Sequence, residues 1–174
     1  RIIALQELGC AMVEIGAQST RPGSVMHDPK DEYAKLKMTL DLLNQQNITI
    51  PLSLDSFNPY TIMKILEHFP IQYVNDVTGK LDMRTLEKIA KHGCKIISMH
   101  SLSIPPTAKI RIDEESPPHI TIRDWAKQAS QTLKQVGFRH EDIILDPGIG
   151  FGKSPVQNLL LLKEVHKTEI LELG

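Results

Sequence analysis

The sequence has little cysteine, few aromatic residues, almost no net charge and no long apolar run. Two cysteines in 174 residues, Cys10 and Cys94, are too few for a disulfide framework, and both are expected in buried positions. A net charge of −1 argues against the basic face that nucleic-acid binding needs. No stretch approaches the roughly 20 apolar residues of a membrane span. These absences predict a protein of the reducing cytoplasm that binds neither nucleic acid nor membranes.

What is present is the composition of an ordinary globular domain. The chain is 41% hydrophobic and 24% charged, and its length allows a substantial core. It begins at Arg1 without Met, with a stretch that reads as the tail of a helix closed by Gly9, and it stops at Gly174 without a polar tail. We therefore expect one domain over residues 1–174, cut at both ends.

Apolar runs alternate with segments of helical periodicity, which predicts repeated βα units and a parallel sheet. An N-cap residue followed by proline marks three helix starts, at Asp28, Asn58 and Ser154, and Asp82 can cap a fourth helix. Helices are predicted over 30–46, Met83–His92 and Arg123–Val136, and strands over Ala11–Ile15, Ile48–Asp55, Gln72–Asn75, Lys95–Met99 and Asp142–Asp146.

Two α/β architectures fit this order, an open doubly wound sheet and a (β/α)8 barrel. Five strands do not close a barrel, but a cut at each end would leave space for the missing three. The long connection 101–121 is rich in proline and charge, and connections of this kind are commonly functional loops or disordered segments. We expect it to be mobile without a ligand.

Each predicted strand ends in a polar side chain, and in both architectures sites are built at these strand ends. Asp55, Asn75 and Asp146 would together offer carboxylate acceptors and one amide. Buried carboxylates need N–H donors, which a flat ring with an amino-pyrimidinone edge would supply. The alternative is that Asp55 and Asp76 cap the helices that follow them, which we favour for Asp76.

Two glycine-containing stretches stand beside these residues. In "STRPGS", Thr20 and Arg21 lie in a loop after a strand, which suits an anionic group such as phosphate, although this stretch judged alone favours an ordinary turn with a solvated arginine. "ILDPGIGFGKSP" looks like a phosphate-binding P-loop but has Pro147 where the first glycine is required, and proline has no N–H to offer.

Taken together, "EIGAQSTRPGS", "LSLDS", "VNDVTG", "ISMH" and "IILDPGIGFGKS" resemble the dihydropteroate synthase family in their order and spacing, over nearly all of the chain. The resemblance implies a (β/α)8 barrel, of which this chain would cover about strands 2–6. It also implies synthesis of 7,8-dihydropteroate from a pterin methyl diphosphate and p-aminobenzoate, as a sulfonamide target. Gln18 and Ala17 stand where family members often have Glu and Gly.

The resemblance also implies roles for individual residues. Asp55, Asn75 and Asp146 would hold the pterin edge, with Met99 and Val77 packed on its ring. Thr20 and Arg21 would meet the diphosphate and take the catalytic part, and Gly150 and Phe151 would edge the p-aminobenzoate slot. Lys153 would be a solvated or outer cation, and Ser154 would cap the next helix. Mg²⁺ is implied, with its Asn ligand outside this chain and no metal ligand within it, as is a homodimer.

Two other functions share part of this pattern. A pterin- or folate-binding methyltransferase barrel would use the same strand-end Asp and Asn residues, but it has no use for a diphosphate loop such as "STRPGS". A non-catalytic pterin-binding module would keep the pocket without the reaction. A generic five-stranded α/β domain is the third alternative.

Overall fold

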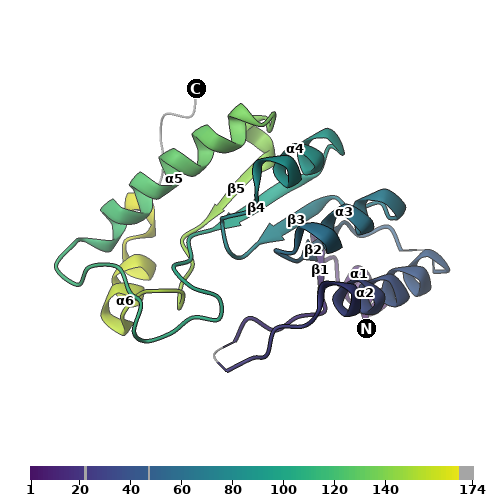
Figure 1. The fold of residues 1–174 in the computed structure, drawn as a ribbon, viewed down its shortest axis with the longest axis horizontal. Coiled ribbons are helices and arrows are strands. Elements are labelled where there is room, and N and C mark those ends of the chain that lie inside the picture. Colours follow the sequence, from purple (N-terminus) through teal and green to yellow (C-terminus); the bar gives the residue numbers. More distant parts are fainter. Residues whose placement is uncertain (22, 47, 169–174) are drawn as a thin grey trace.

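The computed structural model describes residues 1–21, 23–46 and 48–168, and it contains one parallel sheet covered by helices (Figure 1). The five strands are β1 (Val13–Gly16), β2 (Leu52–Asp55), β3 (Tyr73–Asp76), β4 (Lys95–Met99) and β5 (Ile143–Asp146). The six α-helices are α1 (Ile2–Glu7), α2 (Pro29–Asn44), α3 (Pro59–His68), α4 (Met83–Lys91), α5 (Pro118–Gln135) and α6 (Pro155–Lys163), with short 3-10 turns η1 (His140–Asp142) and η2 (Val165–Thr168).

The strand order distinguishes the two architectures. The strands lie in the sheet in chain order, β1-β2-β3-β4-β5, and every pair is parallel. A doubly wound sheet reverses its order at a switch point, whereas right-handed crossovers in unbroken order keep all connecting helices on one face. The sheet is therefore an arc of a barrel wall.

Four of the predicted helix starts are where the sequence placed them, because the cap side chains make the expected hydrogen bonds, whereas the helix predicted from Arg123 begins earlier, at Pro118. Asp28 accepts from the N–H of Lys30, Asn58 from that of Tyr60, and Ser154 from that of Gln157. Asp82 likewise accepts from the N–H of Thr85. Each bond satisfies a backbone donor that the first turn leaves free, so these residues set where α2, α3, α6 and α4 begin.

The predicted strands all exist, with shifts at their ends. β4 matches its prediction. β1 begins two residues later and β3 one residue later than predicted, each ends one residue further along, and β5 begins one residue later. The largest error is at β2, predicted from Ile48 but starting at Leu52 after Pro51. Proline has no N–H to donate to a neighbouring strand, so the regular hydrogen bonding of β2 begins only after Pro51. Asn47 lies outside the described residues.

The hydrophobic core lies between the sheet and its helices. Leu54, Val74 and Ile96 of the strands and Ile62 and Ile89 of the helices are all fully buried. The strand residues alternate with those on the opposite face, so the helix-covered face is apolar and the other face is free to carry polar side chains. The core thus fixes which residues face the inside of the barrel.

Cys94 is buried as predicted, but the prediction for Cys10 is wrong. Cys10 follows Gly9 after the end of α1 and is exposed. Cys94 directly precedes β4, and its thiol donates to the carbonyl of Ile71. Burial raises the pKa of the Cys94 thiol to about 11, which keeps it protonated and unreactive.

A buried polar group ties α2 to the start of α3. Glu32, only 1% exposed, accepts hydrogen bonds of 2.8 Å from the hydroxyls of Ser56 and Thr61. A buried carboxylate needs such donors, and these come from the segment that follows β2.

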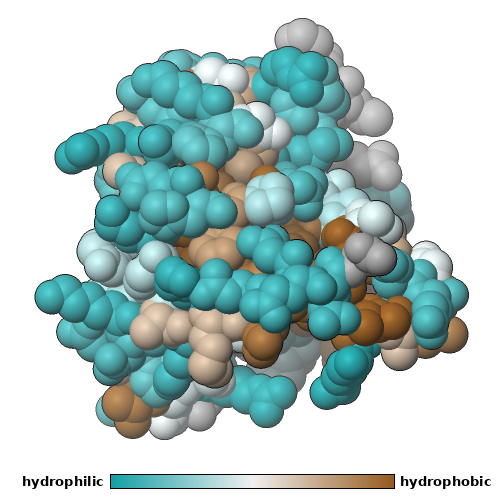
Figure 2. All heavy atoms as spheres, turned by 90° about the vertical axis from the view of Figure 1, so that its right-hand side faces the viewer, coloured by the Kyte–Doolittle hydropathy of each residue, from teal (hydrophilic) through white to brown (hydrophobic). Residues whose placement is uncertain are grey.

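The outer surface at the right-hand side of Figure 1, near α3 and α4, is mostly hydrophilic with hydrophobic side chains between the polar ones (Figure 2). Within the described ranges, we find no helix with the length and apolarity needed to traverse a bilayer.

The long connection after β4 is shorter than predicted because α5 begins at Pro118, so residues 118–121 are helical. Residues 101–117 contain no helix or strand. This segment is nevertheless anchored: the N–H of Ile112 donates to the carbonyl of Gly152, and the Gln157 amide donates to the carbonyl of Asp113. Its mobility without a ligand stays a prediction, with Ile112, 7% exposed, as a fixed point within it.

Candidate functional site

The register of the sheet brings the predicted ring-binding residues onto one face. Asp55 pairs with Asn75, which pairs with Ile97, which pairs with Ile144. Asp146 pairs with Met99, two residues further along β4 than Ile97. Because paired residues of parallel strands share a face, and so do residues two apart, Asp55, Asn75 and Asp146 all lie on the face opposite the helices. They occupy the carboxyl ends of their strands, where a barrel builds its sites.

Asp55 is the least satisfied member of this set. No group in the described part of the chain donates a hydrogen bond to its carboxylate. Burial, followed by the negative charges of Glu14 and Glu32, raises its pKa to about 7. The neighbouring strand leaves room for it with Gly16, where a Cβ would lie 3.0 Å from Asp55 Oδ2. A ligand that donates N–H groups would satisfy this carboxylate.

Asn75 is oriented by a residue that the sequence analysis did not select. Its Nδ2 donates to Glu14 Oε2 at 2.8 Å, so a side chain of β3 reaches one of β1 over the intervening strand β2. The hydroxyl of Ser53, on the strand between them, donates to the same oxygen at 3.4 Å. With one N–H engaged, Asn75 presents its carbonyl oxygen and one further N–H to a ligand. Glu14 was recognisable in the sequence as the last charged residue of β1.

Asp146 holds the loop that follows β5. Its Oδ1 accepts from the N–H of Gly148 at 2.7 Å, which leaves Oδ2 for a ligand. Gly148 has a φ of +66°, and a Cβ there would stand 2.0 Å from the carbonyl oxygen of His100. Glycine is therefore required by both its backbone conformation and its close neighbour. The loop after β5 is packed directly on the loop after β4.

The helix-capping alternatives for the strand-end carboxylates are wrong. The cap of α3 is Asn58 and that of α4 is Asp82, so neither Asp55 nor Asp76 caps a helix. Asp76 instead holds the turn after β3, where it accepts from the N–H and hydroxyl of Thr78 and from the N–H of Leu81. A short polar side chain at a strand end can serve such a turn as readily as a helix.

Lys153 is not a solvated cation, so of the two predicted alternatives only that of an outer cation remains. The residue is 6% exposed, and its ammonium lies within 2.9 Å of His100 Nδ1 and of the carbonyl oxygens of Gly148 and Phe151. Burial lowers its pKa to about 8, opposed by the charge of Asp146. His100 is buried too, and burial together with Lys153 lowers its pKa to about 4, so it is neutral and can accept from the ammonium.

The remaining predicted residues follow β1, β3 and β5, and within the described residues none has a side-chain hydrogen bond to Asp55, Asn75 or Asp146. Val77 is buried directly after β3, while Gly150, with a φ of +87°, and Phe151 lie in the loop after β5. Thr20 is half-buried and Arg21 exposed, in the part of the chain after β1 whose described residues, 17–21 and 23–28, project from the sheet (Figure 1). No hydrogen bond or ion pair joins either side chain to the strand-end residues in the described ranges. Pro22 lies outside them.

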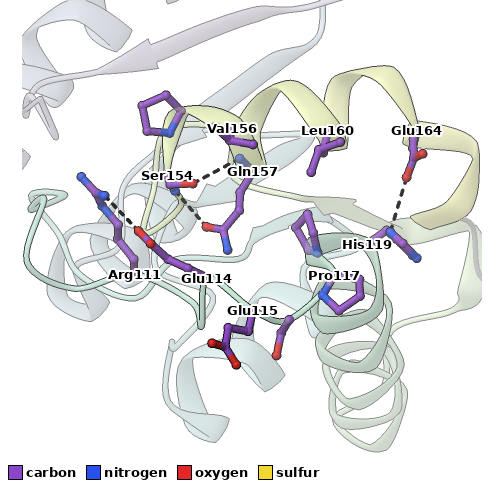
Figure 3. A pocket seen from close by; sticks show the side chains of 13 residues that line it. Arg111, Glu114, Glu115, Pro117, His119, Ser154, Val156, Gln157, Leu160 and Glu164 are labelled. Carbon is purple, nitrogen blue, oxygen red and sulfur yellow. Dashed lines mark hydrogen bonds and ion pairs between the residues drawn. The ribbon is translucent and has the colours of Figure 1, made fainter.

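A cavity of about 640 Å³ lies elsewhere, between α6 and the segment 111–119 (Figure 3). Val156 and Leu160 line it from α6, and two ion pairs stand at its ends, Arg111 with Glu114 and His119 with Glu164. None of the strand-end residues lines this cavity. It is separate from the candidate site.

Comparisons with known proteins agree with this geometry. Residues 2–174 match the family described as pterin binding enzyme. The folate synthesis bifunctional protein of Chlamydia trachomatis serovar D is 34% identical over 170 residues, which cover 91% of this chain and 36% of that protein. Dihydropteroate synthase type-3 of Escherichia coli is 30% identical over 162 residues, covering 91% and 60%. The chain thus spans less than two thirds of the length of these relatives.

The fold is also that of solved structures. Dihydropteroate synthase from Anaplasma phagocytophilum with bound 6-hydroxymethylpterin-monophosphate matches with a TM-score of 0.85 at 30% identity, over 95% of this chain and 66% of that one. The predicted barrel fold is confirmed by this likeness together with the strand order.

Proposed function

The chain belongs to the pterin-binding enzyme family, and on that premise we propose that the protein containing it is a dihydropteroate synthase. It would join 6-hydroxymethyl-7,8-dihydropterin diphosphate to p-aminobenzoate, giving 7,8-dihydropteroate and diphosphate. One observation carries the proposal: Asp55, Asn75 and Asp146 present acceptors on one face at the strand ends. A pterin ring carries N–H donors along one edge, which is the complement that these acceptors need.

Asp55, Asn75 and Asp146 each have a proposed part in binding the ring. Asp55 lacks a donor within the described chain and has its pKa raised to about 7, so a donor-bearing ring would stabilise its ionised form. Asp146 offers Oδ2, and Asn75, held by Glu14, offers its carbonyl oxygen. Met99, 5% exposed, and Val77 would pack on the ring. The relative from Anaplasma, which holds a hydroxymethylpterin monophosphate, supports a ligand of this class.

The proposed reaction is a displacement at the methylene carbon of the pterin. The aniline nitrogen donates its lone pair to that carbon, the carbon–oxygen bond to diphosphate breaks, and the nitrogen then loses a proton. Thr20 and Arg21 would stabilise the leaving diphosphate, and Gly150 and Phe151 would edge the arylamine slot. Correct orientation of the two reactants alone contributes on the order of 7–11 kcal/mol. A neutral aniline is nucleophilic enough that we assign no general base.

The further expectations stay proposals. In the ranges the structure describes, no three or more His, Cys, Asp or Glu side chains come together in a group that could hold a metal, so we derive no step through Mg²⁺. Bound Mg²⁺ would neutralise diphosphate charge. A homodimer, a cytoplasmic location and a single partial-barrel domain over residues 1–174 are likewise proposed.

The test is product formation by the intact protein. Incubated with the pterin diphosphate, p-aminobenzoate and Mg²⁺, it should release 7,8-dihydropteroate and diphosphate. Pterin binding without product would favour a non-catalytic module. Tight binding of a methylated folate with no affinity for diphosphate would favour a methyltransferase barrel, which would use the same strand-end Asp and Asn residues.

A further inference from the structure

Lys153 is a buried cation with four hydrogen-bond acceptors around it and no carboxylate among them. Its Nζ lies 2.9 Å from the carbonyl oxygens of Gly148 and Phe151, 2.9 Å from His100 Nδ1 and 3.3 Å from the carbonyl oxygen of His100. Buried lysines are normally paired with an acid, because taking an ammonium out of water is unfavourable. Here the charge is instead surrounded by backbone dipoles from two loops.

These contacts join the loop after β5 to the loop after β4. Gly148 and Phe151 belong to the first, and His100 directly follows β4. The loops also touch where a side chain is not tolerated, since a Cβ at Gly152 would lie 2.8 Å from Leu102 Cγ. The ammonium therefore stands at the junction of two segments that leave neighbouring strands of the sheet.

The conformation of the β5 loop depends on a small number of bonds. Its glycines at 148, 150 and 152 all have positive φ, a conformation that is entropically unfavourable to fix. Apart from Lys153, side chains hold the loop through Asp146 Oδ1 to the N–H of Gly148 and Asn158 Oδ1 to the N–H of Gly150, and backbone N–H groups reach two of its carbonyls, from Ile112 to Gly152 and from Phe151 to Gly148. Within the described residues, Lys153 is the side chain that donates to the carbonyls of Gly148 and Phe151.

We propose that Lys153 is a positioning residue, whose buried ammonium fixes the carbonyls of Gly148 and Phe151 against His100 and so shapes the rim that receives the arylamine. The loop-fixing part stands on the contacts alone. The arylamine part rests on the proposed function, which gives Gly150 and Phe151 to the p-aminobenzoate slot.

The charged groups around Lys153 define a pH dependence. Burial lowers its pKa to about 8, and Asp146, at the end of β5, is the charge that favours the ammonium. His100 is neutral above about pH 4, Lys80 acts on His100 at a distance, and α5 contributes the uncharged Trp125 against the His100 ring. As the pH rises through about 8, Lys153 loses its charge and one of its three donors, so its hold on the carbonyls weakens.

The experiment compares Lys153→Met, which keeps the length of the side chain, with Lys163→Met, an exposed lysine at the end of α6, in the intact protein. Amide hydrogen exchange of the peptide covering 147–153 reports the loop. Steady-state kinetics report KM for p-aminobenzoate and for the pterin diphosphate. We expect faster exchange and an arylamine KM raised about tenfold in Lys153→Met only, with the pterin KM within about twofold.

Each outcome decides one part. Unchanged exchange overturns the loop-fixing role, whatever the activity. Faster exchange with an unchanged arylamine KM overturns the link to the slot, and so does a wild-type protein that makes no dihydropteroate, which also ends the proposed function. If Lys153→Met does not fold, the wild-type protein still decides, because its arylamine KM must rise between pH 7 and 9, and a flat profile overturns the inference.

Discussion

At the scale of single residues, Asp55 makes stability depend on pH. Its pKa of about 7 lies above the ordinary value of 3.8, so the folded protein holds a proton that the unfolded chain has lost. The associated stabilisation is complete below about pH 4 and is lost as the pH rises through about 7. Asp55→Asn removes this titration and should leave the protein more stable than wild type at pH 8, by about 2–4 kcal/mol.

Urea unfolding of the apo protein at several pH values measures the difference. The stability gap between Asp55→Asn and wild type should open between pH 4 and 7 and stay constant above that. Asp124→Asn, at an exposed position of α5, should track wild type throughout. A constant gap between Asp55→Asn and wild type would mean that the carboxylate has its ordinary pKa.

Asp146 gives a second residue-scale prediction, for pterin affinity. In Asp146→Asn the amide oxygen can still accept from the N–H of Gly148, so the loop survives, but an NH₂ group replaces Oδ2. Two donors would then face each other, and losing a charged hydrogen bond costs about 1.5–3 kcal/mol, or about 10- to 150-fold in Kd. Calorimetric titration with 6-hydroxymethylpterin measures this.

The matched control lies at the other end of the same segment. Asp142, just before β5, binds Arg139 rather than a ligand, so Asp142→Asn should leave the pterin Kd unchanged. Equal affinities for Asp146→Asn and wild type would remove Asp146 from the site.

At the scale of elements, the helix starts were predictable because their determinants are local. Asp28, Asn58 and Ser154 each combine a cap side chain with a following proline, and neither feature needs tertiary information. Strand ends depend on pairing partners, so the predicted strand at β2 is too long. The predicted helix at α5 starts too late because the prediction places Pro118 in the preceding loop. Periodicity gave the order of elements, and only the register showed which strand residues share a face.

Other parts of the site could not be read from local sequence. Lys153 follows glycine and precedes a helix cap, a context typical of an exposed side chain, and its burial depends on carbonyls that two separate loops supply. Glu14 acts through Asn75, 61 residues further along the chain. In both cases a polar contact joins residues far apart in the sequence, for which the sequence holds no periodic signal.

The cap of α6 yields a prediction at this scale. Ser154 and Gln157 form a reciprocal capping box (Figure 3), and the Gln157 amide also donates to the carbonyl of Asp113. Ser154→Ala should lower the free energy of unfolding by about 1 kcal/mol, because it leaves an N–H of the first turn without its acceptor. Chemical denaturation at fixed pH measures this.

Ser130→Ala is the contrasting variant. The Ser130 hydroxyl is fully buried within α5 and has no hydrogen-bond partner in the described part of the chain. Its removal should be neutral or stabilising, since an unpaired buried hydroxyl is unfavourable. A larger loss for Ser130→Ala than for Ser154→Ala would contradict this account of both residues.

At the scale of the whole molecule, the sheet is an arc with two edges. β1 and β5 each pair with one neighbour in the described chain and not with each other. Beside β5, helix α6 exposes Val156, Leu159 and Leu162. Unpaired edges and exposed apolar side chains both favour association. We therefore expect the 174-residue chain, produced by itself, to self-associate.

Sedimentation velocity over a range of concentrations tests this and can identify the surface involved. Ile144→Lys places a charge on the β5 edge strand, whereas Val156→Lys places one on α6; both positions are exposed, at 41% and 66%. If edge pairing drives association, only Ile144→Lys should shift the chain toward monomer, since a charge on an edge strand opposes strand addition. If the helix surface drives it, Val156→Lys should act instead. If the wild-type chain is monomeric at every concentration, neither the sheet edges nor the exposed apolar side chains of α6 drive association, and the expectation is wrong.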